Sequence, residues 1–207
     1  MLIGARQVQS NKKALPYDAE VEYLESTGEQ WIDTGITPGT NTTVETLVTT
    51  TVTSQDIPIF GSVSTSIGSG ALQYHLTPYS SKWYWGSNEE QEHANGTYTP
   101  IVGRTWHILF NSNRKIIVNG AVLISSVNIK NPLNGQTLAI SFRKGSNGAR
   151  SGQWKYSYFK IYESGTLVRD LISVRIRDVG YMYDRVSETL FSNAGTGGFV
   201  VGRDVSN

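Results

Sequence analysis

The stretch "WHILFNSNRKIIVNGAVLI" at residues 106–124 decides how the rest of the chain is interpreted. It begins with a strand in which Trp106, Ile108 and Phe110 alternate with other residues, so one face is large and apolar. A polar turn and a second strand follow, and that strand ends at Asn-Gly, residues 119–120. Asn-Gly is a strong hairpin signal, because a type I′ turn needs a positive φ at both central residues. The stretch therefore predicts a three-stranded antiparallel meander.

Similar short runs surround this meander on both sides. Apolar or Thr residues alternate with polar ones, and Gly, Pro, Asn and Ser separate the runs, at residues 42–53, 57–64, 71–77, 82–87, 137–144 and 153–176. No window of about a dozen residues has apolar positions at helical spacing. About a dozen strands with frequent turns are typical of a sandwich or a barrel. We therefore predict an all-β fold, an antiparallel β-sandwich.

The run at residues 153–176 predicts a hairpin whose turn is Glu163-Ser164-Gly165. Alternation places Phe159 and Ile161 on one face of its first strand. The opposite face carries Tyr158, Lys160 and Tyr162. If the alternation is counted from the start of the same strand, it places the aromatic residues Trp154, Tyr156 and Tyr158 on one face instead. Further along the chain, Asp184 and Arg185 are expected to fix a turn before a glycine-rich loop.

Composition and charge exclude several classes of partner. The chain has 207 residues, 38% of them hydrophobic and 11% aromatic, which suits one domain with a substantial core. The formal net charge is +1, from 18 basic and 17 acidic residues, so no overall field attracts nucleic acid or an anionic membrane. There is no cysteine, which excludes disulfides and thiolate metal sites. No apolar run approaches the roughly 20 residues that cross a bilayer, so we expect no membrane insertion.

Two flanking segments, together with the central meander, resemble a known family. The segments are "AEVEYLESTGEQWIDTGITP" at residues 19–38 and "FKIYESGTLVRDLISVRIRDVGYMYDRVSETLFSNAGTGGFVVG" at residues 159–202. They resemble the start and the end of a concanavalin A-like, laminin-G-like lectin module found in bacteriophage fibre and other virion proteins, and in some gut-bacterial surface proteins. The resemblance implies a jelly roll over residues 18–207 and a lectin-like role, but it names no ligand.

Residues 1–17 differ from the rest of the chain. They carry Arg6, Lys12 and Lys13 with no acidic residue before Asp18. We interpret them as an N-terminal arm that attaches the domain to other virion proteins or helps it to form a homo-oligomer; the alternative is a disordered or loosely packed N-terminus without such a role. The start of the chain has only a short apolar patch and does not read as a secretory signal. We therefore expect assembly in the host cytoplasm and a place in the virion. The alternative is a secreted carbohydrate-binding module at a bacterial cell surface.

Sugar binding needs aromatic faces beside amide or carboxylate groups that hydrogen-bond to hydroxyls. The stretch at residues 74–88 has this content, and the candidate glycan-binding residues are Tyr74, His75, Tyr79, Trp83, Trp85 and Asn88. Because Tyr84 separates the two tryptophans, at least one member of this trio must face away from the core if the segment is a strand. The alternative is that these aromatic residues line the sandwich core or an interface between subunits.

Some jelly rolls of this class are glycoside hydrolases, which need two positioned carboxyl groups. The densest acidic group, Glu89, Glu90 and Glu92, reads as a solvated loop, and we expect no catalytic residues and no enzyme activity. The three histidines, His75, His93 and His107, lie in separate segments without metal-ligand spacing. We expect no cofactor. Laminin-G-like domains often hold calcium, but no Asp-rich loop supports it here, so a metal site stays open.

Overall fold

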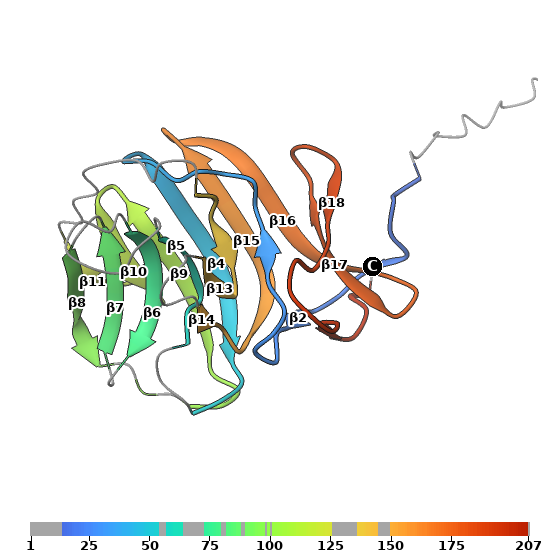
Figure 1. Ribbon diagram of the computed structural model, residues 1–207, viewed down its shortest axis with the longest axis horizontal. Coiled ribbons are helices and arrows are strands. Elements are labelled where there is room, and N and C mark those ends of the chain that lie inside the picture. Colours follow the sequence, from blue (N-terminus) through green and yellow to red (C-terminus); the bar gives the residue numbers. More distant parts are fainter. Residues whose placement is uncertain are drawn as a thin grey trace, which may run out of the picture.

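A computed structural model of the chain describes residues 14–53, 57–63, 73–79, 82–87, 90–97, 99, 101–125, 136–144 and 150–206. These residues form strands and turns, and the strands build two sheets (Figure 1). The sheets are antiparallel throughout except for one parallel pair. In this part of the chain no helix is long and apolar enough to span a membrane. The predicted all-β, two-sheet architecture is confirmed.

The larger sheet has the strand order β11-β10-β9-β4-β15-β16-β17-β18, with β1 joined to β16 and with β2 joined to β15 and β19. The strand bounds are β1 Ala19–Glu20, β2 Leu24–Glu25, β4 Thr42–Thr50, β9 Thr105–Ser112, β10 Lys115–Val118, β11 Ala121–Ile124, β15 Trp154–Glu163, β16 Thr166–Ile176, β17 Val179–Asp184, β18 Thr189–Phe191 and β19 Val200–Val201. The long strands β4, β15 and β16 lie side by side in the middle of the molecule, and β16 continues toward β17 and β18 (Figure 1).

The smaller sheet has the order β14-β13-β5-β6-β7-β8, and β12 connects β5 to β3. Its strand bounds are β3 Ile32–Asp33, β5 Phe60–Val63, β6 Gln73–Tyr79, β7 Lys82–Ser87, β8 Glu90–Thr97, β12 Ala139–Ile140, β13 Phe142–Lys144 and β14 Arg150–Ser151. Strand β8 pairs with β7 and contains Glu90 and Glu92. The prediction that this acidic stretch is a loop was therefore wrong, because backbone pairing with β7 overrode its polar composition.

The central meander forms as the sequence predicts. Strands β9, β10 and β11 pair in order, and Trp106, Ile108 and Phe110 are at most 5% exposed. Asn119 and Gly120 both have positive φ, at 49° and 80°, as a type I′ turn requires. The meander joins β4 and supplies part of the main core between the two sheets.

A β-bulge in β15 decides which residues reach the outer face of the large sheet, the face that points away from the small sheet. The register with β4 shifts between Tyr156, which pairs with Val48, and Tyr158, which pairs with Leu47. Trp154 and Tyr156 are fully buried in the core, whereas Tyr158 is only partly buried on the outer face. The predicted row of Trp154, Tyr156 and Tyr158 on one face is therefore wrong, because the extra residue reverses the alternation. The competing prediction, with Tyr158 beside Lys160 and Tyr162, is confirmed.

Residues 17–31 and 166–205 pack together into what we call the terminal unit, at the end of the molecule beyond the small sheet (Figure 1). Strand β19 pairs with β2, and the Trp31 amide donates to the Asn193 side chain at 3.1 Å. Gly180 allows this close approach, because a Cβ there would lie 2.5 Å from the Leu24 side chain. The two segments that carry the family resemblance are thus largely one structural unit.

The N-terminal arm meets the domain at the terminal unit. Tyr17 packs edge to face against Tyr183 at 5.0 Å, and the Asp18 amide donates to the Arg175 carbonyl at 2.9 Å. Tyr17 therefore belongs to the folded domain, whereas Leu15 is 59% exposed. Residues 1–13, which make up most of the predicted arm, lie outside the described residues.

Candidate binding surface on the large sheet

Four of the six sequence-predicted glycan residues lie inside the sandwich. Tyr74, His75, Trp83 and Trp85 are at most 2% exposed. Tyr79 ends β6, with its side chain outside the described part, and Asn88 lies outside the described residues.

Tyr74, Trp83 and Trp85 pack with the core, whereas His75 takes the other face of β6, where its Nδ1 lies 3.2 Å from the Thr77 hydroxyl. Trp83 packs edge to face against Trp106 with ring centroids 5.4 Å apart, and the Tyr74 hydroxyl donates to the Thr42 carbonyl at 3.0 Å. Because both tryptophans point inward, the intervening Tyr84 takes the opposite face of β7 and is only partly buried. The buried rings offer no face on which a sugar could stack in this structure, which agrees with the alternative interpretation of the stretch as core.

The outer face of the large sheet carries a different set of polar and aromatic side chains around Glu45. The two carboxylate oxygens accept one hydrogen bond each from a tyrosine hydroxyl, from Tyr158 at 3.1 Å and from Tyr162 at 2.9 Å. The Lys160 ammonium lies 3.9 Å and His107 Nε2 lies 3.5 Å from the same carboxylate. We call these five residues the tyrosine cluster. Neighbouring strands β4, β9 and β15 hold them in register.

The electrostatics of the tyrosine cluster favour an ionised Glu45 between neutral phenols. Burial alone would raise the pKa of Glu45, but the hydrogen bond from Tyr162, the charge of Lys160 and the hydrogen bond from Tyr158 outweigh it and lower the pKa. Burial and the Glu45 carboxylate raise the pKa of Tyr162 to about 12, and they raise the pKa of Tyr158 as well. The phenols therefore stay protonated at neutral pH and keep donating to Glu45, which fixes the orientation of both rings.

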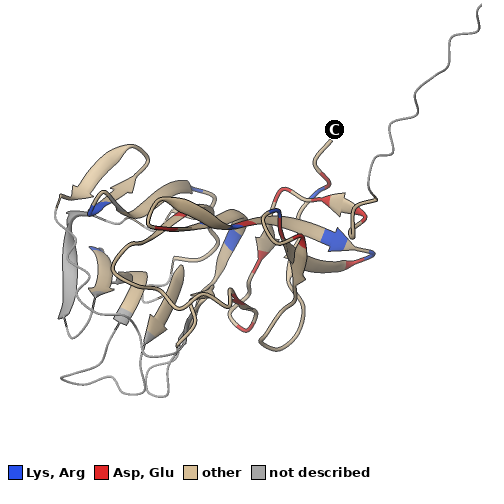
Figure 2. Ribbon diagram, turned by 90° about the horizontal axis from the view of Figure 1, so that it is seen from above, with Lys and Arg blue, Asp and Glu red and all other residues tan. Residues whose placement is uncertain are grey.

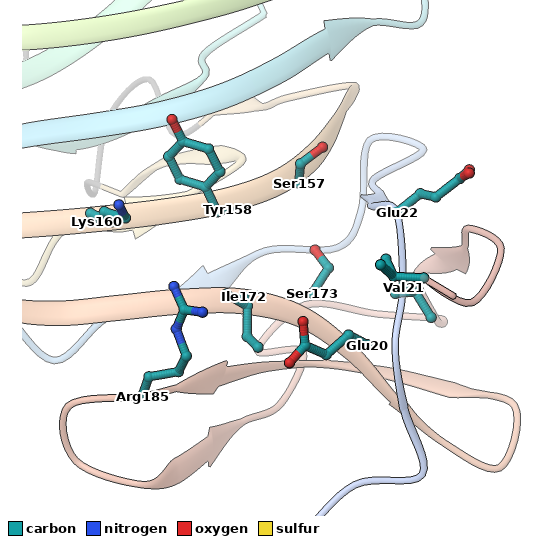
Figure 3. A pocket seen from close by; sticks show the side chains of 10 residues that line it. Glu20, Val21, Glu22, Ser157, Tyr158, Lys160, Ile172, Ser173 and Arg185 are labelled. Carbon is teal, nitrogen blue, oxygen red and sulfur yellow. The ribbon is translucent and has the colours of Figure 1, made fainter. Parts of the chain in front are cut away.

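A pocket of about 380 Å³ lies on one side of the tyrosine cluster (Figure 3). Strand β15 contributes Ser157, Tyr158 and Lys160, and β16 contributes Ile172 and Ser173. The remaining lining residues come from distant parts of the terminal unit and are Glu20, Val21, Glu22, Arg185 and Val205. Figure 3 shows Glu20 and Arg185 extending toward one another beside Ile172, whereas Glu22 points away from the other labelled side chains.

A second pocket of about 300 Å³ lies on the other side of the same cluster. Its lining residues are Thr43, Glu45, Leu109, Asn113, Tyr162 and Gly165. Glu45 and Tyr162 line this pocket, while Tyr158 and Lys160 line the first one. The tyrosine cluster therefore lies between the two pockets, and we call the cluster with both pockets the outer groove.

Both cations that line the outer groove are paired with carboxylates. Arg185 holds Asp170 at 2.9 Å, and Lys160 faces Glu45 as described. Figure 2 shows both signs interspersed over the β15–β17 region and the terminal unit, without a large area of one sign. Among the described residues, no group of three or more His, Asp or Glu side chains is placed to hold a metal ion. The groove therefore offers hydroxyls, a carboxylate and partly buried phenol rings to a polar ligand.

Sequence reasoning missed Glu45, although the sequence contains a signal for it. Glu45 is the single charged residue in the strand "TTVETLVTT" of β4, where it lies on the face opposite the buried Val44, Thr46 and Val48. A carboxylate in the middle of a sheet face needs partners, and Tyr158, Lys160 and Tyr162 had already been assigned to one outward face. Only the pairing of β4 with β15 shows that the two sets meet.

In comparisons with known proteins, no protein-family model and no curated protein matches this chain.

Proposed function

We propose that this chain is a non-enzymatic structural protein of a bacteriophage virion, a fibre, decoration or adhesion module, whose sandwich binds a glycan in the outer groove. The observation that carries the proposal is the terminal unit. The start and end segments that resemble phage lectin-like modules are far apart in the sequence, yet β2 pairs with β19 and β1 with β16. The resemblance therefore coincides with a packed unit instead of with scattered, unrelated hairpins.

The arrangement of the molecule supports an attachment role for one end. The described chain begins beside Tyr183, and its last strand pairs with β2, so both ends of the described chain lie at the terminal unit (Figure 1). Strands β6, β7 and β8 lie at the opposite end. An arm over residues 1–17 would thus leave the domain at the end remote from the small sheet, which suits a module held by one end on a particle.

The chemistry of the outer groove supports binding more than catalysis. Glycoside hydrolysis needs a general acid whose pKa is raised, beside a second carboxylate. The pKa of Glu45 is lowered instead, and its carboxylate is engaged by two phenols and a lysine. A fixed, ionised acceptor between two tyrosine rings is suited to hydrogen-bonding sugar hydroxyls while the rings contact the apolar side of a pyranose.

Two measurements test the proposal. Mass spectrometry of purified particles from the source phage should find the protein in the virion, and deletion of residues 1–13, which keeps Tyr17, should reduce its incorporation. A gene neighbourhood of capsid, portal and tail genes would agree with this result. Polysaccharide-utilisation genes, together with a protein absent from particles, would replace the proposal with a secreted carbohydrate-binding module.

A further inference from the structure

We infer that the ligand of the outer groove is an extended, uncharged glycan chain that occupies both pockets, and not a single sugar or an acidic polysaccharide. The inference rests on the proposed glycan-binding function and deepens it. It follows from two independent features of the groove, the distribution of its charges and the presence of one pocket on each side of the tyrosine cluster.

Cations in the groove are already neutralised. Lys160 faces the Glu45 carboxylate at 3.9 Å, and Arg185 binds Asp170 through Nε and through its terminal nitrogen, both at 2.9 Å. Glu20 adds another carboxylate to the same pocket and accepts a hydrogen bond from the Tyr17 hydroxyl at 3.0 Å. A uronic acid entering here would meet carboxylates without a spare cation.

Carboxylates also outnumber cations around the groove. The two pockets are lined by Glu20, Glu22 and Glu45, and Asp170 lies behind Arg185, whereas Lys160 and Arg185 are the cations among the lining residues. Four carboxylates against two cations give a local excess of negative charge at neutral pH. Like charges at short range disfavour binding, and this repulsion weakens as salt screens it. An uncharged sugar avoids that repulsion and can still bond to Glu45 and the hydroxyls.

The two pockets, one on each side of the tyrosine cluster, offer room for a ligand longer than one ring. Tyr158 lies at the first pocket and Tyr162 at the second, four residues apart on the same strand. At a rise of about 3.3 Å per residue their backbone positions are about 13 Å apart, although both hydroxyls converge on Glu45. Each tyrosine is held by a different oxygen of one carboxylate, so the two rings are oriented together. A chain that lies along β15 can reach into both pockets, whereas a monosaccharide occupies one.

The probe is an array of uncharged and uronic-acid oligosaccharides, each series running from the single sugar to the hexamer, with titration calorimetry of the binders. We expect binding within the uncharged series, with affinity that rises at least about tenfold from disaccharide to hexamer. We expect uronic-acid oligomers of equal length to bind at least about tenfold more weakly at low salt. Tyr162→Ala should reduce the affinity for the hexamer to that of a short oligomer.

Thr105→Ala is the matched control, because Thr105 is exposed on β9 outside both pockets. All variants are compared only if their thermal unfolding midpoints agree with the wild type. Equal affinity for the single sugar and the hexamer, or tighter binding of the uronic-acid series, would overturn this inference while leaving glycan binding intact. If no oligosaccharide on the array binds, both the proposed glycan binding and this inference are wrong. The proposed place in the virion is tested separately, by mass spectrometry of purified particles, and would not be affected.

Discussion

Replacing Asp184 should destabilise the protein more than replacing any exposed carboxylate. Its side chain is fully buried and accepts hydrogen bonds from the Asp170 amide at 2.8 Å, the Val186 amide at 3.1 Å and the Ser187 hydroxyl at 2.6 Å. The Arg169 guanidinium lies 3.6 Å away. Asp184→Ala leaves these donors without their acceptor. Because removing one partner of a buried charged network costs about 3–5 kcal/mol, we expect that loss in the free energy of unfolding.

Asp184→Asn separates the charge from the hydrogen bonds. The amide oxygen can still accept from the backbone, while the amide nitrogen replaces the oxygen that accepts from Ser187. We expect a smaller loss of about 1–3 kcal/mol. The assay is urea unfolding, read as a lower midpoint with an unchanged slope. Asp204→Asn is the control, because Asp204 is exposed and pairs with Arg175 at the surface, so its midpoint should move much less.

The same unfolding experiment, repeated at several pH values, tests the role of the Asp184 charge a second time. Burial alone would raise its pKa, but hydrogen bonds from the Asp170 amide and from Ser187 outweigh burial, and the net pKa is lowered. Because the pKa of Asp184 is lower in the folded protein than the value of about 3.9 in the unfolded protein, its ionised carboxylate stabilises the fold at pH values above about 3.9. This stabilisation is lost as the pH falls through the pKa of the folded state. The difference between wild type and Asp184→Asn should therefore be full at pH 7 and shrink in acid. A loss below about 1 kcal/mol for Asp184→Ala, or a difference that grows in acid, refutes this reasoning.

Three further predictions concern packing and the tyrosine cluster. Gly180→Ala should cost about 1–3 kcal/mol, measured by chemical unfolding, because its Cβ would overlap Leu24; a neutral result contradicts the close approach. Trp83→Ala should lower the free energy of unfolding by about 3–5 kcal/mol in the same assay, since the ring is 2% exposed. If this variant binds glycan less well, the loss should be explained by the fraction of protein that is unfolded. Glu45→Gln should lower the pKa of Tyr162 from about 12, measured by NMR of labelled tyrosine, because its carboxylate raises that pKa; an unchanged pKa contradicts the contact.

Local patterns were enough to predict most of the strands. Asn119-Gly120, the turn at Ser164-Gly165 and the alternation in β4 each carry their signal within a few residues, and all three are confirmed. The alternation expected over residues 42–53 holds in β4 through Thr50, the last residue of the strand. Val52, which belongs to the same run of sequence, lies beyond the end of the strand. Where the sequence pattern failed, the cause was strand pairing, as in the acidic stretch that forms β8 beside the preceding strand β7.

The candidate site was harder to predict than the fold, because it depends on which face each side chain takes. Alternation counted forward from the buried Trp154 places Tyr158 on the core face. Alternation counted back from Tyr162 places it on the outer face. The bulge between Tyr156 and Tyr158 resolves this conflict, but it is visible only in the register with β4. Similarly, the content of residues 74–88 suits a sugar site, but burial of Trp83 and Trp85 places those rings in the core. Composition cannot distinguish an inward tryptophan from an outward one.

The most direct test of the account is an NMR titration of protein with labelled tyrosine and tryptophan rings, using the strongest uncharged oligosaccharide from the array. The account predicts that the ring signals of Tyr158 and Tyr162 shift together with one dissociation constant, while the indole signals of Trp83 and Trp85 stay in place. Shifts of the two indoles without any change at the tyrosines would contradict it, because the ligand would then occupy the small sheet and not the outer groove.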